Sequence, residues 1–273
     1  IMPQATFAHK GLEEEVTVAF DAFLANTRRG VMNFNINDLV LSANGLSLNG
    51  YGNASDILSD DPTITLDGSI AASLDSLMRF IPDSLDMTAR GSIAAQISGT
   101  ARLSHLGLYT FSQSDLTGKA SSDSIVFRSP GDSISVTLRG VELALGPESV
   151  TSRRDTSQTF RLVGISGKVG EFMASYKESL SASGKEITVS AKNAAVTDTL
   201  SLGRLGGRVS AKELNVADAS GTSIDLDDTQ NGFQMMPDRN NPKIPVLTLS
   251  SSNKRINLAT EVNRAILTDA SIE

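Results

Sequence analysis

Short stretches in which apolar and polar residues alternate recur along the whole chain. The clearest covers Ser133–Leu145, where every second residue is aliphatic and the alternation resumes after Arg139-Gly140. Because the side chains of a strand point alternately to its two faces, this spacing predicts strands with one aliphatic face. The same pattern predicts strands at Phe34–Ile36, Leu39–Leu41, Leu46–Leu48, Ile64–Leu66, Ile125–Phe127, Ile187–Val189, Ile224–Leu226, Leu247–Leu249 and Ile256–Leu258. Gly, Asn, Asp and Ser separate these segments, as tight turns require.

One segment has helical spacing. In Ser73–Pro82 the apolar residues Leu74, Leu77, Met78 and Ile81 recur at i, i+3, i+4 and i+7. Ser73 is a suitable N-cap residue and Pro82 blocks continuation, so we expect one short helix near 73–81. Leu12–Leu24 fits both a helix and a strand, and its β-branched Val-Thr-Val favours a strand.

The patterns predict an all-β fold: an elongated, curved antiparallel sheet of repeated hairpins that forms a groove or an open sandwich. A unit of the form apolar-x-Gly-basic-small recurs at Leu116–Ala120, Ile165–Val169 and Leu205–Val209, each time before a further alternating segment. Its irregular spacing favours hairpins with loops of variable length over a strict solenoid.

No change of composition divides the chain, so 1–273 is interpreted as a single elongated β-rich region. It opens in mid-pattern, and we interpret it as a fragment of a longer protein. Pro147–Gln158, which contains Arg153 and Arg154, is predicted to be a loop or hairpin tip. A subdivision, if there is one, is expected near 147–158. Asp227–Pro245 is predicted to be a second irregular stretch.

Composition excludes several kinds of chemistry. The chain has no Cys, which excludes disulfides, Cys-ligated zinc and thiol nucleophiles. Its net charge of −7 makes nucleic acid an improbable partner. No apolar run approaches the roughly 20 residues of a membrane-spanning helix.

No candidate catalytic or metal site is supported by its surroundings. The only histidines, His9 and His105, have no partner constellation. Asp227–Asp238 has a faint resemblance to a calcium loop, but an Asn-Gly turn is the better interpretation. Gly203, Gly206 and Gly207 precede a strand rather than a helix, which favours turn or bulge geometry over a phosphate loop.

Paired carboxylates give no acid/base site either. Asp227 and Asp228 are adjacent in sequence, so on a strand they are expected to face opposite ways, and Asp60-Asp61-Pro62 is interpreted as a turn. The sequence therefore predicts no catalytic residue, no metal and no cofactor.

Several segments resemble bacterial AsmA-like proteins and their TamB-like relatives. The strands Leu39–Gly45 and Leu46–Gly50, with the Asn-Gly between their apolar segments, resemble that family. So does Asp67–Ile70, followed by the helix around Leu74–Ile81, then Gly91–Ile93 and Ile97–Ala101. The resemblance covers Gly11–Leu145 best. The family consists of large envelope proteins of Gram-negative bacteria, which have an inner-membrane anchor and a long periplasmic β-rich region. The anchor of the family is not found in this sequence.

The resemblance implies a non-enzymatic periplasmic module that shields or transfers lipid and takes part in outer-membrane biogenesis. Its expected partners are phospholipid or another acyl-chain ligand, with other envelope proteins as further candidates. Inner-membrane attachment would come through segments outside this chain. The scarcity of aromatic residues favours an apolar groove over a filled core. The residues expected to contact lipid are Ile134, Val136, Leu138, Leu143, Ile187 and Val189.

Two other hypotheses stay open. The first is a structural or adhesive β-sandwich module with an ordinary closed core and no lipid ligand, because alternation looks the same in that fold. The second is a glycan-active β-solenoid, which the absence of Trp disfavours.

Overall fold

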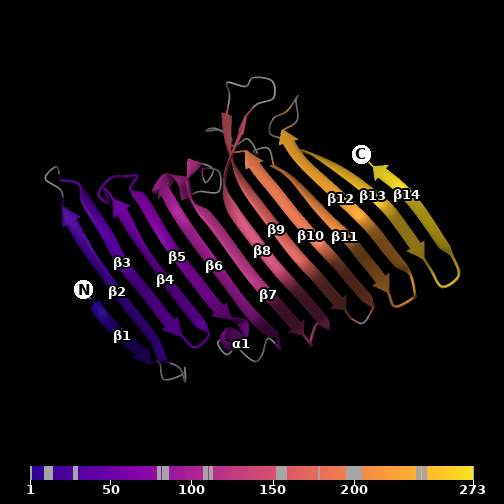
Figure 1. Cartoon of the computed structure of the whole chain (residues 1–273), viewed down its shortest axis with the longest axis horizontal. Helices are drawn as coiled ribbons and strands as arrows, with labels where there is room; N and C mark the ends of the chain where they lie inside the picture. Colours follow the sequence, from indigo (N-terminus) through magenta and orange to yellow (C-terminus); the bar gives the residue numbers. More distant parts are fainter. Residues whose placement is uncertain are drawn as a thin grey trace.

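The computed structural model describes residues 2–8, 15–26, 30–78, 81, 86–106, 110, 113–151, 159–177, 179–194, 205–237, 241 and 245–272. These residues form one sheet of 14 strands in which the spatial order follows the order in the chain. Figure 1 shows the strands side by side in a single twisted layer, with β1 at one edge and β14 at the other. The all-β, antiparallel fold predicted from the sequence is confirmed, in its open form.

Each strand pairs antiparallel with the next strand along the chain. The strands are β1 (Met2–Ala8), β2 (Glu15–Asn26), β3 (Met32–Ala43), β4 (Leu46–Ser55), β5 (Thr63–Ser73), β6 (Thr88–Arg102), β7 (Thr117–Ser129), β8 (Ile134–Thr151), β9 (Thr159–Tyr176), β10 (Leu180–Ala194), β11 (Leu205–Asp218), β12 (Ser223–Pro237), β13 (Pro245–Ala259) and β14 (Arg264–Ile272). A helix α1 (Leu74–Leu77) follows β5, and a 3-10 helix η3 (Leu103–Leu106) follows β6.

The local predictions are largely confirmed. Every predicted strand segment lies in a strand, and Glu15–Asn26 resolves the ambiguous segment as a strand. Ser73 caps α1 by accepting a hydrogen bond from the Ser76 amide at 3.4 Å. The helix is shorter than its apolar stripe, since it ends at Leu77 with Met78 as its C-cap.

Two local predictions are wrong. Asp227–Pro237 belongs to β12, so the expected Asn-Gly turn is absent there: Asn231 pairs with Val209 on one side and Ser251 on the other. Gly206 and Gly207 lie within β11, not in a turn or bulge, and Gly203 lies outside the described residues. In both cases pairing with both neighbouring strands overrides the local preference for a turn.

Of the two alternatives for Pro147–Gln158, a loop or a hairpin tip, the described residues fit the hairpin. Pro147–Thr151 extends β8 and pairs with 159–163 of β9, while 152–158, with Arg153 and Arg154, lie outside the described residues.

Cross-strand partners lie on the same face of a sheet, so the pairing defines its two faces. One row of partners crosses β2 to β13 and contains only apolar residues and glycine. Its members are Phe20, Leu39, Gly50, Gly68, Ile97, Gly118, Leu145, Ile165, Ala191, Gly207, Phe233 and Leu249. We call the face that carries this row the inner face and the opposite one the outer face.

Left-handed residues interrupt the alternation in β8, β10, β12 and β14. Gly140, Glu186, Asp228 and Asp269 have φ values of 59°, 48°, 48° and 52°, and they occupy one row across the sheet. A left-handed residue leaves the extended conformation, so the alternation of side chains shifts by one position there. In β8 the apolar positions accordingly change from even numbers, ending at Leu138, to odd numbers, starting at Val141.

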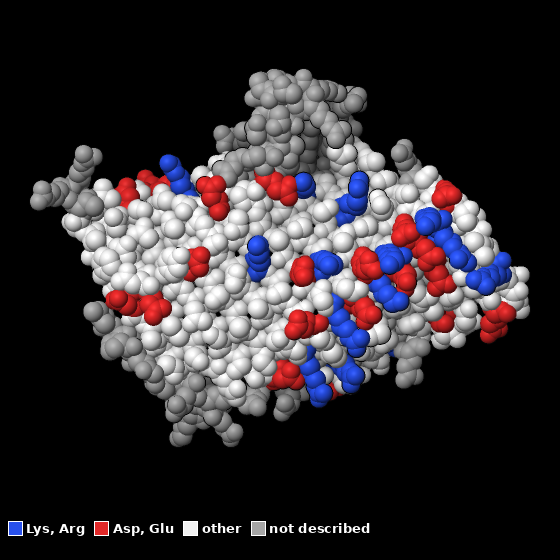
Figure 2. Space-filling view, viewed as in Figure 1, with Lys and Arg blue, Asp and Glu red and all other residues white. Residues whose placement is uncertain are grey.

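At this shift two consecutive residues of a strand point to the outer face, and charged residues occupy most of these positions. One row holds Arg139, Glu171, Lys185, Glu213, Asp227 and Arg255, and the next holds Glu186, Lys212, Asp228, Lys254 and Asp269. We call these two rows the charged ridge. Figure 2 shows its acidic and basic side chains gathered on one face over the C-terminal half of the sheet. Asp227 and Asp228 therefore share the outer face, contrary to the expectation for a regular strand.

Several inner side chains opposite the ridge are enclosed. Ser122, Ala211, Thr229 and Asn253 lie in one row directly beside the ridge positions and are 7%, 6%, 2% and 7% exposed, while Val141, Val169 and Ile187 of the same row are half-buried. Side chains on the inside of a bend converge and cover one another. We therefore interpret this row as the inside of a bend in the sheet and call it the crease.

The glycines of the recurrent sequence unit lie on the inner face of β7, β9 and β11. Beside Gly167, a methyl group in place of its hydrogen would approach the Leu143 Cδ2 atom to 2.9 Å. At Gly207 the same addition would collide with the Phe233 ring. At Gly167 and Gly207 the glycine therefore makes room for a large apolar side chain from the neighbouring strand, whereas a methyl group at Gly118 would make only ordinary contacts, with the Leu145 Cβ atom at 3.9 Å.

The sheet leaves far more surface exposed than a compact protein does. Its accessible area is 18210 Å², whereas a compact monomer of 28.8 kDa exposes about 11,300 Å². Among the described residues only Ala101, Leu116 and Ala211 are buried apolar residues. A second layer that would close a core is not found in the described part of the chain.

Replacing Gly140 with valine tests the role of the left-handed row. The new Cβ atom would meet nothing closer than the Gly170 amide nitrogen at 3.6 Å, so the cost arises from the φ of 59° alone. We expect the free energy of unfolding to fall by about 1–2 kcal/mol, measured by denaturant titration. Gly206→Val is the control, because its φ is ordinary and its Cβ would meet only the Phe233 carbonyl oxygen, at an ordinary 3.8 Å. Equal losses in the two variants would contradict the role given to the left-handed row.

Candidate ligand-binding surface

The inner-face positions of the described strands are mostly apolar. Aliphatic residues, alanine, glycine and a few aromatics occupy them, with polar residues in β7 and in a short segment of β12 and β13. Charged residues stand at inner-face positions only near strand ends, at Asp218 opposite Leu180 and at Arg161 opposite Ser149. Many of the apolar side chains are solvent-exposed, among them Ile97, Leu143 and Leu249 at 44%, 48% and 61%. A continuous apolar surface of this size is characteristic of a binding surface in a soluble protein.

The inner face is hollowed over β3 to β6. The hollow has a volume of about 460 Å³ and an apolar lining. Its side-chain walls include Phe34, Ile36, Leu39, Leu66, Ile70 and Ile97. Pockets for small ligands typically measure about 300–1,000 Å³ and are mostly apolar, so this hollow has the size and chemistry of a binding site.

A pair of facing glycines forms the floor of the hollow. Gly50 pairs with Gly68 across β4 and β5, and both lie on the inner face. A methyl group at Gly50 would come within 2.9 Å of the Asp67 carbonyl oxygen. Glycine at these positions keeps the floor low while the flanking side chains stand above it.

All six residues predicted to contact lipid lie on the inner face, in two groups. Leu143 and Val189 flank Gly167 from opposite sides, and Ile187 lies in the crease row beside Val169. The other group lies beyond the crease in β8: Leu138 pairs with Phe172, and Val136 pairs with Ala174 on one side, while Ile134 starts the strand. None of the six lines the hollow of β3 to β6.

Sequence reasoning missed the hollow, although its signal is present. Leu39, Leu48 and Ile70 lie in segments that alternate clearly. What marks a hollow rather than a filled face is the glycine at Gly50 and Gly68, and their juxtaposition depends on the β4–β5 register. That register is not evident from either segment alone.

Ion pairs hold the charged ridge on the outer face. Lys185 contacts Glu213 at 2.7 Å, Arg139 contacts Glu171 at 3.2 Å, and Lys212 contacts Glu186 at 3.0 Å. The hydrogen bond and charge of Glu213 raise the pKa of Lys185, with a smaller contribution from Glu171. The hydrogen bond and charge of Glu186 likewise raise the pKa of Lys212. These groups are exposed, so each pair adds little stability on its own, and their main effect is to fix the cross-strand register.

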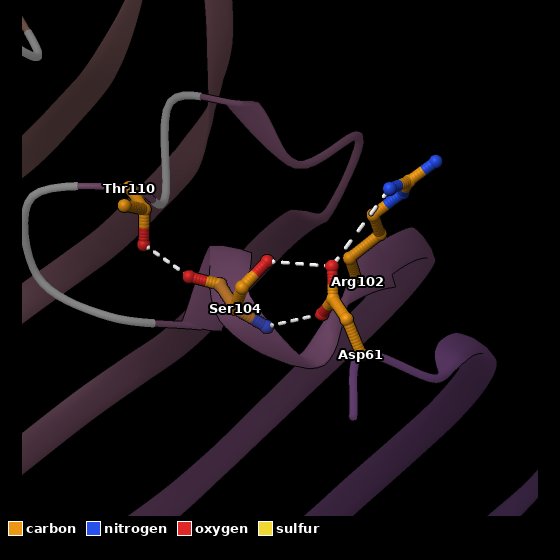
Figure 3. A network of polar contacts seen from close by, with 4 residues as sticks. All are labelled: Asp61, Arg102, Ser104 and Thr110. Carbon is orange, nitrogen blue, oxygen red and sulfur yellow. Dashed lines mark hydrogen bonds and ion pairs between the residues drawn. The ribbon is translucent and has the colours of Figure 1, made fainter. Parts of the chain in front are cut away.

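A second polar cluster joins two loops at the rim of the sheet (Figure 3). The Asp61 carboxylate accepts hydrogen bonds from the Ser104 amide at 2.8 Å and from the Ser104 hydroxyl at 2.9 Å, and Arg102 lies 3.8 Å away. The Thr110 hydroxyl donates to the Ser104 carbonyl at 2.6 Å. Asp61 thus caps the start of η3 from the loop between β4 and β5. The predicted Asp60-Asp61-Pro62 turn is part of that loop, but its capping role was not evident in the sequence.

The geometry of this cluster is that of a cap rather than of a catalytic pair. The hydrogen bond from the Ser104 amide lowers the pKa of Asp61, helped by the Ser104 hydroxyl, Arg102 and His105. A carboxylate with a lowered pKa is a weak base at neutral pH, whereas activation of a serine needs a base matched to that pH. His9 lies outside the described residues. In the described part of the chain, no three His, Asp or Glu side chains come together as a metal site would require.

Acidification should release the Asp61 cap. Because its pKa in the folded protein is below the usual 3.8, the stabilisation is fully present above 3.8 and is lost as the pH falls through the folded-state value. We expect the protection of the Ser104 amide, its exchange rate relative to an unstructured amide at the same pH, to fall as the pH drops below 3.8. In Asp61→Asn this protection should already be lower above that pH and should converge with the parent protein in acid, measured by NMR. Asp60→Asn is the control. An Asp61→Asn protein with unchanged exchange would exclude the cap.

Within the described residues, no helix has the length and apolar character needed to cross a membrane. No family model, no curated protein and no solved structure matches this chain.

Proposed function

We propose that this chain is a non-enzymatic module that shields or transfers lipid along its inner face. The observation that carries the proposal is the mostly apolar inner face of a sheet with no second layer in the described residues. Water contact with such a surface is unfavourable by about 25 cal/mol for each Å² of apolar area. An acyl chain is the ligand that covers an extended apolar strip without needing specific hydrogen bonds.

The hollow of β3 to β6 is the best place for one acyl chain. Its side-chain walls are apolar, Asp67 is the one charged residue along its lining, and its open side leaves a polar headgroup free to reach water. Transfer of each methylene group from water contributes about 0.8 kcal/mol, so even partial engagement of a long chain is worth several kcal/mol. The six inner-face residues of β8 and β10 would extend the path beyond the hollow.

The proposal includes a cellular setting. On the resemblance to AsmA-like proteins, the chain would work in the periplasm of a Gram-negative bacterium, in outer-membrane biogenesis. The full-length protein would be anchored to the inner membrane through segments outside this chain. Phospholipid is the first candidate ligand, with other envelope proteins as additional partners.

The alternative is a structural or adhesive β-sandwich module with a closed core. That fold needs two packed layers, and the described strands supply one. The exposed inner residues would then need a cover of protein in place of lipid.

Val136→Asp separates the two functions. Val136 lies half-buried on the inner face of β8, next to the outer-face residue Thr137. If lipid covers this face, the new carboxylate can still reach water, so bound lipid should fall while the melting temperature changes little. If protein covers it, an unpaired buried charge should cost several kcal/mol and collapse the melting transition. Co-purifying lipids are measured by mass spectrometry, with Thr137→Asp as the matched control.

Gly68→Leu tests the hollow itself. Its Cβ would meet the Asn49 carbonyl at an ordinary 3.4 Å, so the fold should tolerate the change while the leucine side chain fills the floor. We expect less co-purifying lipid than in the parent protein or in the outer-face control Ser69→Leu. Lipid-free parent protein, expressed and purified without detergent, would refute the proposed function.

A further inference from the structure

The basic residue of the recurrent sequence unit occurs as Lys119 in β7, Lys168 in β9 and Arg208 in β11. Each of them directly follows an inner-face glycine, so its own side chain stands on the outer face, the face shown in Figure 2. All three side chains are exposed. The unit therefore gives the outer face one cation on every second strand from β7 to β11.

These three cations have no ion-pair or hydrogen-bond partner among the described residues. The ridge differs, since Lys185 there contacts Glu213 at 2.7 Å. Glu142 faces Lys168 across the β8–β9 pairing, but no ion pair joins them. In a chain with a net charge of −7, cations without a counter-charge are available to an anion from outside.

Two rows of outer-face residues beside the ridge form the walls of a trough that crosses β6 to β13. One row reads Gln96, Lys119, Ala144, Ser166, Ser190, Arg208, Gly232 and Ser250, and the other reads Ala94, Ser121, Glu142, Lys168, Thr188, Ser210, Gln230 and Ser252. We call this feature the polar trough. Glu142 is the one acidic residue in these two rows, so the trough is basic as a whole.

The polar trough deepens into two hollows, and the cations stand along them. The larger hollow, over β6 to β10, has a volume of about 760 Å³ and includes Lys119 and Lys168. The other, over β11 to β13, has a volume of about 480 Å³ and includes Arg208. The two adjoin, because Ser190 of the first pairs with Arg208 of the second. Most of the other outer-face residues along them carry hydroxyl or amide groups, which suits a ligand rich in hydrogen-bonding groups.

The three cations alternate between the two walls at regular intervals. Lys119 and Arg208 stand on one wall and Lys168 on the other, each two strands and two residues from the next. With about 4.8 Å between strands and about 3.4 Å per residue, successive cations are about 12 Å apart at their Cα atoms. A pair of linked sugar rings has a similar length, and the long flexible side chains can absorb the difference.

We propose that the polar trough binds a linear anionic glycan that carries an acidic group on every second sugar. Its acidic groups would pair with Lys119, Lys168 and Arg208, and its hydroxyl groups would form hydrogen bonds to the walls. Charge, and not stacking on aromatic rings, would supply most of the affinity. A flat anionic bilayer fits less well, because it would also meet the acidic residues of the adjoining ridge. This inference is independent of the lipid proposal, since it concerns the opposite face of the sheet.

The test uses a hyaluronan octasaccharide, which carries one carboxylate on every second sugar, and the whole chain. We expect saturable binding in calorimetry, weakened by added salt. Lys168→Gln should weaken it by up to about fivefold, the value of one exposed ion pair. The triple variant that also replaces Lys119 and Arg208 with Gln should weaken it by up to about a hundredfold, because sites this far apart act additively. Lys254→Gln removes the same charge from the ridge and is the control. Each variant should keep the melting temperature of the parent protein.

A steric variant separates the trough from a simple patch of charge. Ala144 lies between Lys119 and Ser166, so Ala144→Phe should fill the larger hollow and abolish binding without altering any charge. Thr137→Phe, on the outer face of the same strand but beyond the ridge, is its control and should bind normally. Absence of binding, equal binding of a neutral dextran octasaccharide, or full affinity in the triple variant or in Ala144→Phe would overturn the proposal. Phosphatidylglycerol vesicles that need the three cations more than the glycan does would assign the trough to a membrane and would overturn it as well.

Discussion

Backbone hydrogen bonding between consecutive strands carries this fold, because the sheet buries so few side chains. Only three apolar residues in the described chain are buried, while strands as long as Ile134–Thr151 pair on both edges along most of their length. The ladder satisfies the polar groups of the backbone, and cross-strand side-chain pairs add their smaller contributions. Everything else in the molecule is an arrangement of side chains on the two faces that this ladder creates.

The row of left-handed residues allows the apolar side chains of a long strand to stay on one face of the sheet. A strand of 18 residues with strict alternation would be straight, and its twist would turn the two ends of one face in different directions. Here the shift at Gly140 and its counterparts places two charged positions on the outside and folds the inner side chains toward a crease. The ridge and the crease are thus the two sides of one backbone feature.

The strands were predictable because each has a local signature. Val136 and its neighbours alternate strictly, and Ser73 with Pro82 marks the helix, although the helix ends at Leu77, before the end of its apolar stripe. Asn231-Gly232 was misleading, since the preference of that dipeptide for a turn yields to pairing on both sides.

The candidate site was predictable only in part. The inner-face position of Leu143 and Val189 follows from alternation, and both lie where the pattern placed them. The hollow depends on which glycine faces which, and the ridge depends on the backbone conformation of Asp228 and its equivalents. Neither property is encoded in a single segment. Asp61 illustrates the same limit, since its partner Ser104 lies 43 residues away.

The strictly sequential strand order has a mechanical consequence. Among the described residues, the backbone of each interior strand pairs only with the strands immediately before and after it in the chain, and the two edge strands do not pair with each other. Interaction energies in such an array are those of nearest neighbours, as in repeat proteins. Tension applied between the two edges would therefore peel hairpins one at a time, lengthening the molecule in steps. We therefore expect the sheet to unfold in steps under such tension, and not in a single cooperative event.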